Sequence, residues 1–249
     1  MNYGNIRLMK TNFQDSTMYK AVLTATILSV LLFQFSAIVI SSEKPDAPNV
    51  DTSDIASPEG FPAIGKWMFQ EDMTKARWLG FKWENRILVE PINVIIIDKK
   101  SKTSEEARST LFENLKKAGY LDRSQHSSGY LGYIGGKFYS QLPQEKHHAF
   151  SNKIAEKDNN HGRVFGPCSY KGSFIFIAAF SREILGPISK VDHHYGSFNR
   201  ARDEFAQSLD KKSAYRIVGF LNLNNFIVNS NEYTTGDHDG IAVVVSLGE

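Results

Sequence analysis

The chain has 249 residues, and 29 lysines and arginines against 27 aspartates and glutamates leave a formal net charge of +2. This balance argues against a nucleic-acid-binding surface, and a charged fraction of 22% excludes wholesale disorder. The single cysteine, Cys168, excludes an intrachain disulfide and a cysteine-rich zinc site.

The first distinctive segment is residues 21–42, which contain no charged side chain. Their number exceeds the roughly 20 residues that a helix needs to cross a bilayer. Basic residues dominate the preceding arm, 1–20, and acidic residues follow the segment, so the positive-inside rule places the arm in the cytoplasm. We interpret residues 21–42 as a signal anchor that inserts in the inner membrane and leaves the rest of the chain in the periplasm. Secretion after signal cleavage near Ser42 is the alternative.

Two further segments precede the expected core. Residues 43–65 contain four of the eight prolines, and this composition predicts an extended tether to one exported domain, residues 66–249. The start of that domain holds all three tryptophans, Trp67, Trp78 and Trp83. They indicate a packing or docking segment, and contact with a membrane surface is the alternative.

A strand and a helix come next. Residues 93–97 form a short run of β-branched side chains, which is typical of a strand buried on both faces. Thr103 or Ser104 can cap a following helix whose first turn holds two glutamates, and Gly119 can end it.

Residues 120–160 interrupt this alternation with closely spaced glycines and tyrosines. No helical or strand period persists, so the pattern predicts a long inserted loop or an irregular hairpin. A ligand-contacting role and a tightly packed Ω-type loop are both compatible with this composition.

The remaining pattern predicts strands at 164–165, 173–180, 215–221 and 241–247, with a helix at 198–209. The order is therefore β-α-β-β-α-β followed by one more strand. This order predicts an α+β domain of the ferredoxin-like, split βαβ type, in which both helices cover one face of a mostly antiparallel sheet.

Polar side chains gather where these strands begin and end. Antiparallel neighbours bring the end of one strand beside the start of the next. We therefore expect convergence at one sheet edge of five side chains: His161, Arg163, Arg182, Glu183 and His194.

Four chemical interpretations remain open for this edge. An anionic ligand would bind Arg163, Arg182, Arg202, His193 and His194. Catalysis would use His161, His194 and Glu183. In one version His194 is the general base that activates Ser181 or Cys168 as the nucleophile. A metal would use His161, His193 or His194 with Glu183 or Asp239. The fourth interpretation is a purely structural network of buried pairs. No diagnostic spacing selects among them, and no resident cofactor is predicted.

Several sequence words occur in a suggestive order: ARWLG (76–80), EPINVIIID (90–98), NNHGRVFGP (159–167), AAFSRE (178–183), HHYGSFNRARDEFA (193–206) and DHDG (237–240). Together they resemble the LssY C-terminal-like domain family of bacterial envelope proteins. The resemblance covers about residues 76–247 and implies an exported envelope domain. The family offers no settled activity, and the lipid-phosphatase activity of its multi-pass members is not carried over.

The sequence thus predicts a non-enzymatic, membrane-tethered envelope domain that binds an anionic ligand or a protein partner. Two alternatives remain. One is a hydrolase, metal-assisted or not, acting on an envelope or phosphorylated substrate. The other is an accessory subunit of an envelope or secretion assembly.

Overall fold

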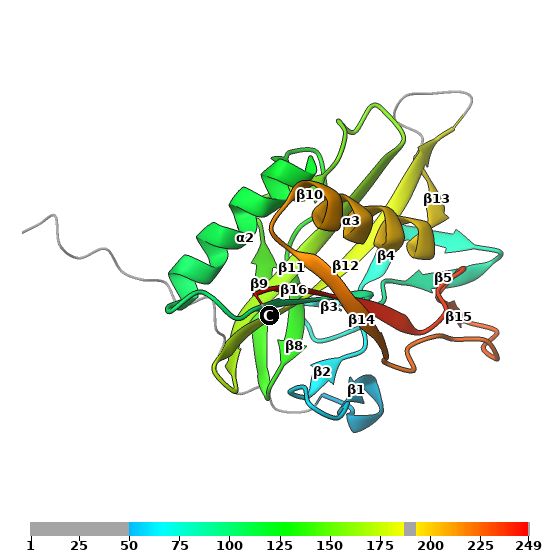
Figure 1. The fold of residues 1–249 in the computed structure, drawn as a ribbon. Helices are drawn as coiled ribbons and strands as arrows, with labels where there is room; N and C mark the ends of the chain where they lie inside the picture. The colour runs from blue at the N-terminus through cyan, green and yellow to red at the C-terminus, as the bar shows by residue number, and fades with distance from the viewer. Residues whose placement is uncertain (1–49, 187–192, 249) are drawn as a thin grey trace, which may run out of the picture. The chain divides into compact units, whose positions relative to one another are not determined.

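The computed structural model describes residues 50–186 and 193–248 (Figure 1). The charge-free segment 21–42 lies outside these ranges. Among the described residues, no helix has the length and apolarity needed to cross a membrane. The prediction of a transmembrane helix and signal anchor is corrected to this extent: neither is shown in the described residues.

A mixed sheet of 13 strands dominates the described ranges. Its main path runs β1-β2-β8-β9-β11-β12-β6-β16-β14, and four further strands pair beside this path. The strands of the main path are β1 (Ile55–Ala56), β2 (Ile64–Gly65), β8 (Tyr130–Ile134), β9 (Lys137–Leu142), β11 (Asn159–Tyr170), β12 (Ser173–Leu185), β6 (Val94–Asp98), β16 (Ile241–Leu247) and β14 (Arg216–Asn222). The four others are β3 (Phe69–Gln70), β7 (Leu121–Arg123), β10 (Ala149–Ser151) and β13 (His193–Ser197).

Two α-helices lie in the described part, and both were predicted. In α2 (Ser104–Ala118), the Thr103 side chain accepts the Glu106 N–H, and Gly119 ends the helix with a φ of 89°. In α3 (Phe198–Lys212), the Ser197 hydroxyl accepts the Arg200 N–H at 2.9 Å. Each cap satisfies an N–H that the first helical turn leaves without a partner.

The ferredoxin-like prediction is wrong. Strands make up 45% of the described structure and helices 17%, so the fold is mostly β. A ferredoxin-like sheet would have four strands with β14 beside β6, but here β16 lies between them, parallel to β6 and antiparallel to β14, in a sheet of 13 strands. The order of elements along the chain does not set which strands become neighbours, and here β16 and the strands of segment 120–160 enlarge and rearrange the sheet.

The segment 120–160 is also more regular than predicted. It contributes β7, β8, β9 and β10 to the main sheet, where β8 pairs with β9 and β10 pairs with both β7 and β11. Gly132 explains part of the glycine content, because a Cβ there would lie 2.4 Å from the Phe165 ring. Residues 50–65, expected to end a tether, instead contain the 3-10 helix η1 (Thr52–Asp54), β1 and β2.

The main sheet buries apolar side chains on both faces. Val94, Ile96, Phe176 and Ala178 face a core shared with α2 and α3 (Figure 1). Alternate neighbours such as Ile95 and Ile177 face a second core, which includes side chains of β2, β8 and β9. Because side chains alternate across a strand, a strand buried on both faces reads as a continuous apolar run.

A separate sheet has three strands in the order β15-β5-β4 and contributes Val89 to one smaller apolar cluster and Trp78 and Leu88 to another. Its strands are β4 (Arg77–Trp83), β5 (Arg86–Val89) and β15 (Tyr233–Thr234). It holds Trp78, which is buried, and Trp83, which is 36% exposed. Trp67 is also buried, so the expected packing role holds for two of the three tryptophans.

Close approach of β11 and β12 gives a test of this architecture. A Cβ at Gly162 would lie 2.4 Å from the Ala179 carbonyl oxygen and 2.6 Å from the Phe180 ring. Gly162→Ala should therefore lower the free energy of unfolding by about 1–3 kcal/mol in urea denaturation. Gly219→Ala in β14 is the matched control, since no atom lies within 4 Å of its new Cβ. Equal stability of the two variants would contradict the assigned β11–β12 contact.

Candidate functional site

The candidate site lies on the inner face of the β11–β12 hairpin. Asn159 is paired with Glu183 and His161 with Ser181. Directly opposed residues of an antiparallel pair share a face, and residues two apart along a strand share it too. Asn159, His161 and Glu183 therefore project together, while the intervening Arg182 projects toward the helices. All three inward side chains are buried.

His126 completes the cluster from the loop between β7 and β8. Its imidazole stacks on that of His161, with ring centroids 4.7 Å apart and an interplanar angle of 24°. The loop is held by a bond from the His126 N–H to the His147 carbonyl oxygen at 2.8 Å. Sequence reasoning missed His126, because it stands 35 positions before His161 with no motif around it. Only its place in the Gly/Tyr-rich segment was a hint.

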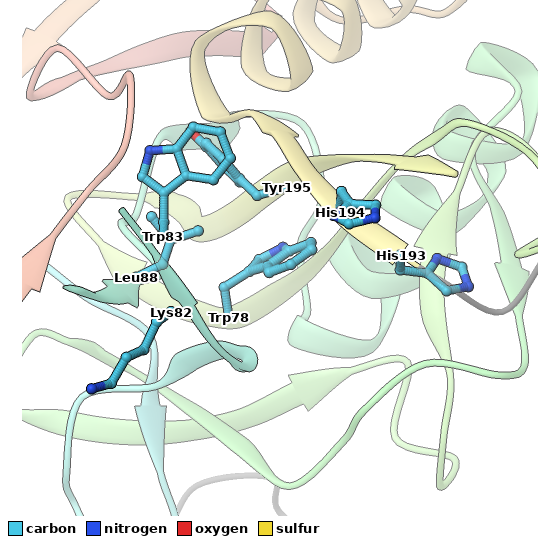
Figure 2. A pocket seen from close by; sticks show the side chains of 7 residues that line it. All are labelled: Trp78, Lys82, Trp83, Leu88, His193, His194 and Tyr195. Carbon is cyan, nitrogen blue, oxygen red and sulfur yellow. The ribbon is translucent and has the colours of Figure 1, made fainter. Parts of the chain in front are cut away.

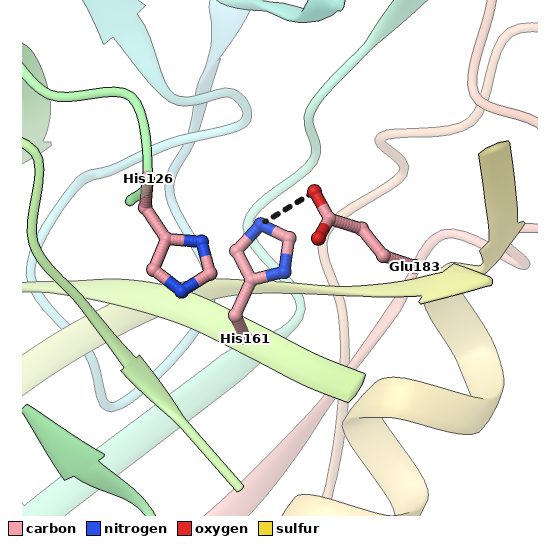
Figure 3. A group of neighbouring side chains, drawn as sticks. All are labelled: His126, His161 and Glu183. Atoms are coloured by element: carbon pink, nitrogen blue, oxygen red, sulfur yellow. Dashed lines mark ion pairs between the residues drawn. The ribbon is translucent and has the colours of Figure 1, made fainter. Parts of the chain in front are cut away.

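Three potential metal ligands meet here. His126, His161 and Glu183 each offer one ligand atom, and these atoms all lie within 4.8 Å of one another (Figure 3). His161 Nε2 lies 3.7 Å from Glu183 Oε1. Ligand atoms around a tetrahedral zinc ion lie about 3.3 Å apart for bonds of about 2.0 Å. Side-chain shifts of roughly an ångström would therefore bring the three groups to coordinating distance.

The hydrogen bonds of Asn159 determine which nitrogen of His161 carries the proton. Asn159 Nδ2 lies 3.0 Å from the Lys157 carbonyl oxygen and 3.3 Å from Glu183 Oε2, and both are acceptors. The amide nitrogen must therefore stand on that side, which leaves Asn159 Oδ1 facing His161 Nδ1 at 3.2 Å. Since that oxygen only accepts, Nδ1 carries the proton. The Nε2 lone pair then points toward the Glu183 carboxylate.

Burial keeps both imidazoles neutral. Desolvation lowers the pKa of His126 to about 3 and that of His161 well below its usual value, and the positive charge of Arg163 lowers both further. Neutral His161, with its proton on Nδ1, thus presents its Nε2 lone pair to the Glu183 carboxyl group. His126 Nε2 is also buried, without a hydrogen-bond partner in the described part of the chain. A cation bound between these groups would be attracted to the His161 lone pair and to Glu183, and it would give His126 Nε2 a partner. It would therefore offset the energetic cost of burying these polar atoms.

Arg163 and Glu90 interact electrostatically with members of the cluster and are not among its three potential ligands. The Arg163 guanidinium donates to the Ser127 carbonyl oxygen at 2.8 Å and to its hydroxyl at 3.0 Å, and it lies over the Tyr130 ring. Glu90 is fully enclosed, and desolvation raises its pKa to about 7, although the positive charge of Arg163 opposes that shift. The interior therefore holds a cation and a carboxyl group that titrates near neutrality.

The other predicted arginines lie elsewhere and are paired with acidic groups. Arg182 faces Glu204 of α3 at 3.5 Å and Asp158 at 3.6 Å. Arg202 binds Asp203 at 2.8 Å and Asp239 at 2.7 Å. Hence Asp239 belongs to an ion pair at the start of β16, and the structure does not bring it to His161.

The two adjacent histidines of β13 have different surroundings. His193 Nδ1 lies 3.2 Å from Glu183 Oε2, so this histidine does join the cluster at its edge. His194 is opposite Ile184 in the β12–β13 register, and its side chain is exposed. Ser181 is buried and accepts a bond from Trp78 Nε1, and Cys168 is a buried member of the second apolar core, so neither is shown beside His194 as a nucleophile would be.

A second group of ligand types lies on the surface. His148 Nδ1 is 2.6 Å from Asp122 Oδ1 and 3.6 Å from Glu145 Oε2. Both carboxylates are exposed, and exposed acidic groups often gather around a histidine without a metal. This group serves below as an internal comparison for the buried one.

Comparison with known proteins adds no assignment: no family model matches the chain, and neither the curated proteins nor the solved structures contain a match. The resemblance to the LssY C-terminal-like domain therefore stays a prediction. The envelope location stays a prediction as well.

Buried neutral histidines predict a loss of stability in acid. An unfolded histidine titrates near pH 6.5, whereas desolvation lowers the pKa of His126 to about 3 and that of His238 to about 4. Below pH 6.5 these histidines bind protons in the unfolded chain but stay neutral in the folded chain. The free energy of unfolding is therefore highest above pH 6.5 and decreases as the pH falls toward 4. We expect the free energy of unfolding to fall by about 1 kcal/mol per such histidine per pH unit. Urea denaturation in the presence of a metal chelator measures this change.

The variant His238→Gln tests the origin of this loss. His238 Nε2 bonds Asn225 Oδ1 at 2.8 Å, and a glutamine amide can donate to the same oxygen without titrating. The variant should therefore show a flatter pH profile than the wild type between pH 6.5 and 4. An unchanged slope would mean that His238 is not held neutral in the folded state.

Proposed function

We propose that this domain binds a divalent transition-metal ion through His126, His161 and Glu183. The observation that carries the proposal is the orientation of His161, whose Nδ1 proton is held by Asn159 while its Nε2 lone pair faces Glu183. Metal-binding histidines are usually oriented in this way, by a hydrogen bond from the ring nitrogen that does not bind the metal. Two neutral imidazoles and a carboxylate are a donor set that suits zinc and also iron(II).

Three protein ligands leave a coordination position open to water or to a substrate. Zinc sites that catalyse hydrolysis have this form, because the ion lowers the pKa of its bound water to about 7. Among the functions considered for this chain, metal-assisted hydrolysis is therefore the one that the geometry favours. Burial, together with the charge of Glu183, raises the pKa of Glu90 to about 7, so this carboxyl group can exchange a proton at neutral pH.

The alternative of an anion site built from three arginines has less support. Arg182 and Arg202 already face carboxylates, and Arg163 donates to Ser127 in the interior. An anion would have to displace these partners and would leave buried charges unpaired. The structure thus favours the histidine cluster over the arginines as the place where a ligand binds.

Zinc titration of the full chain tests the proposal. After chelation and dialysis, isothermal titration calorimetry should show one zinc ion bound per chain. The ion should also raise the melting temperature, because a ligand at 100 times its Kd adds about 2.7 kcal/mol to stability. His126→Ala and Glu183→Gln should each weaken zinc binding at least a hundredfold. Asn159→Ala, which removes only the orienting contact, should weaken it about 10–100-fold.

The matched control is His148→Ala, which removes the histidine of the surface group. It should leave zinc affinity unchanged. If stoichiometric zinc binding survives His126→Ala and disappears in His148→Ala, the metal binds at the surface group and the proposal is wrong. Melting curves of the metal-free variants show whether each remains folded.

A further inference from the structure

A cavity of about 270 Å³ opens beside the histidine cluster. Side chains from β4, β5 and β13 line it, and its apolar walls are Trp78, Trp83, Leu88 and Tyr195 (Figure 2). The Tyr195 ring meets Trp78 and Trp83 edge-on, with centroids 5.8 Å and 5.0 Å away. Trp83 is 36% exposed, so an aromatic surface is accessible at the cavity without unfolding.

Hydrogen bonds hold two of these rings in place. Trp78 Nε1 donates to Ser181 Oγ at 3.2 Å. The Tyr195 hydroxyl donates to Asp237 and accepts the Phe198 N–H at 3.0 Å. A binding surface that is already ordered loses little conformational entropy when a ligand arrives.

Two contacts connect the cavity to the proposed metal site. Ser181, which Trp78 contacts, is paired with His161 across the β11–β12 ladder. His193, which lines the cavity, contacts Glu183 Oε2, while Glu183 Oε1 faces His161. The Glu183 carboxylate, itself a proposed ligand, therefore links His193 at the cavity to His161, and Trp78 in the cavity wall contacts β12, the strand that carries Glu183.

The lining also indicates the charge of a ligand. Its polar members are Lys82, His193 and His194, and the seven described lining residues include no carboxylate. Glu183 engages His193 through Nδ1, so Nε2 is the ring atom with which His193 can meet a molecule in the cavity. This surface suits an anionic or neutral group next to an apolar one and disfavours a cation.

We infer that this cavity is the substrate subsite of the proposed metal centre, and that it takes an organic anion, a phosphate or carboxylate carrying a ring or short apolar group. The inference rests on the proposed function. The apolar part packs against Trp78, Trp83 and Tyr195. The anionic part lies toward His193 and the open coordination position of the metal.

Phenylphosphonate is a suitable probe, because it combines a ring with a phosphate-like anion and does not hydrolyse. Calorimetry and tryptophan emission should show saturable binding to the zinc-loaded full chain. Inorganic phosphate and benzyl alcohol, which each lack one half of the probe, should bind at least tenfold more weakly. Trp83→Ala should weaken phenylphosphonate binding at least tenfold. Phe220→Ala, at an aromatic side chain of β14 that is 64% exposed, is the control and should change nothing.

Zinc titration of Trp83→Ala separates the two claims. Normal zinc binding with weakened phenylphosphonate binding supports the subsite. Normal zinc binding with unchanged phenylphosphonate binding, or a probe that binds no better than phosphate, overturns the subsite and leaves the metal site standing. Absence of zinc binding in the wild type overturns the proposed function, and the inferred link between cavity and metal falls with it.

Discussion

The antiparallel pairing of β11 with β12 is the constraint on which the rest of the structure depends. The two strands pair from Asn159 with Glu183 to Tyr170 with Ser173. Strand geometry sends alternate side chains to opposite faces, so this single register separates two sets of polar groups. Asn159, His161 and Arg163 turn to the inner face. Asn160 and Arg182 turn to the helices, where both contact Glu204. A slip of one residue would exchange the two sets.

The polarity of the inner face has an energetic cost that its hydrogen bonds only partly offset. Asn159 satisfies the Glu183 carboxylate and one nitrogen of His161, and Ser127 satisfies part of Arg163. Burial holds the imidazoles neutral, and the His161 lone pair still faces a carboxylate oxygen. An apolar core of the same volume would avoid these costs. A metal ion bound there, as proposed above, would offset these costs, and the donor types suit such an ion.

The sequence predicted best those helices and strands that have strong local signals, such as capping residues and apolar runs. α2 begins and ends where its capping threonine and terminal glycine indicate, and β16 spans the predicted 241–247. β11 was predicted only at 164–165 but spans 12 residues. Its first five residues, Asn159–Arg163, are polar side chains and one glycine, so they lack the apolar pattern by which a buried strand is recognised. They are nevertheless buried, because Asn159 and His161 belong to the polar cluster. Which strands become neighbours has no local signal, and the ferredoxin-like prediction failed there, because β16 lies between β6 and β14 and segment 120–160 adds strands to the sheet.

The sequence by itself determined the two helices, the apolar strands and the membership of His161 and Glu183 in a polar group near strand ends. Capping, periodicity and β-branched runs are local, so neighbouring residues suffice to read them. Tertiary structure decided which polar residues meet. It added His126 from a loop, kept His193 at the edge, and assigned Arg202 and Asp239 to an ion pair elsewhere. These choices depend on strand register and on chain segments distant in sequence, which no local pattern of residues encodes.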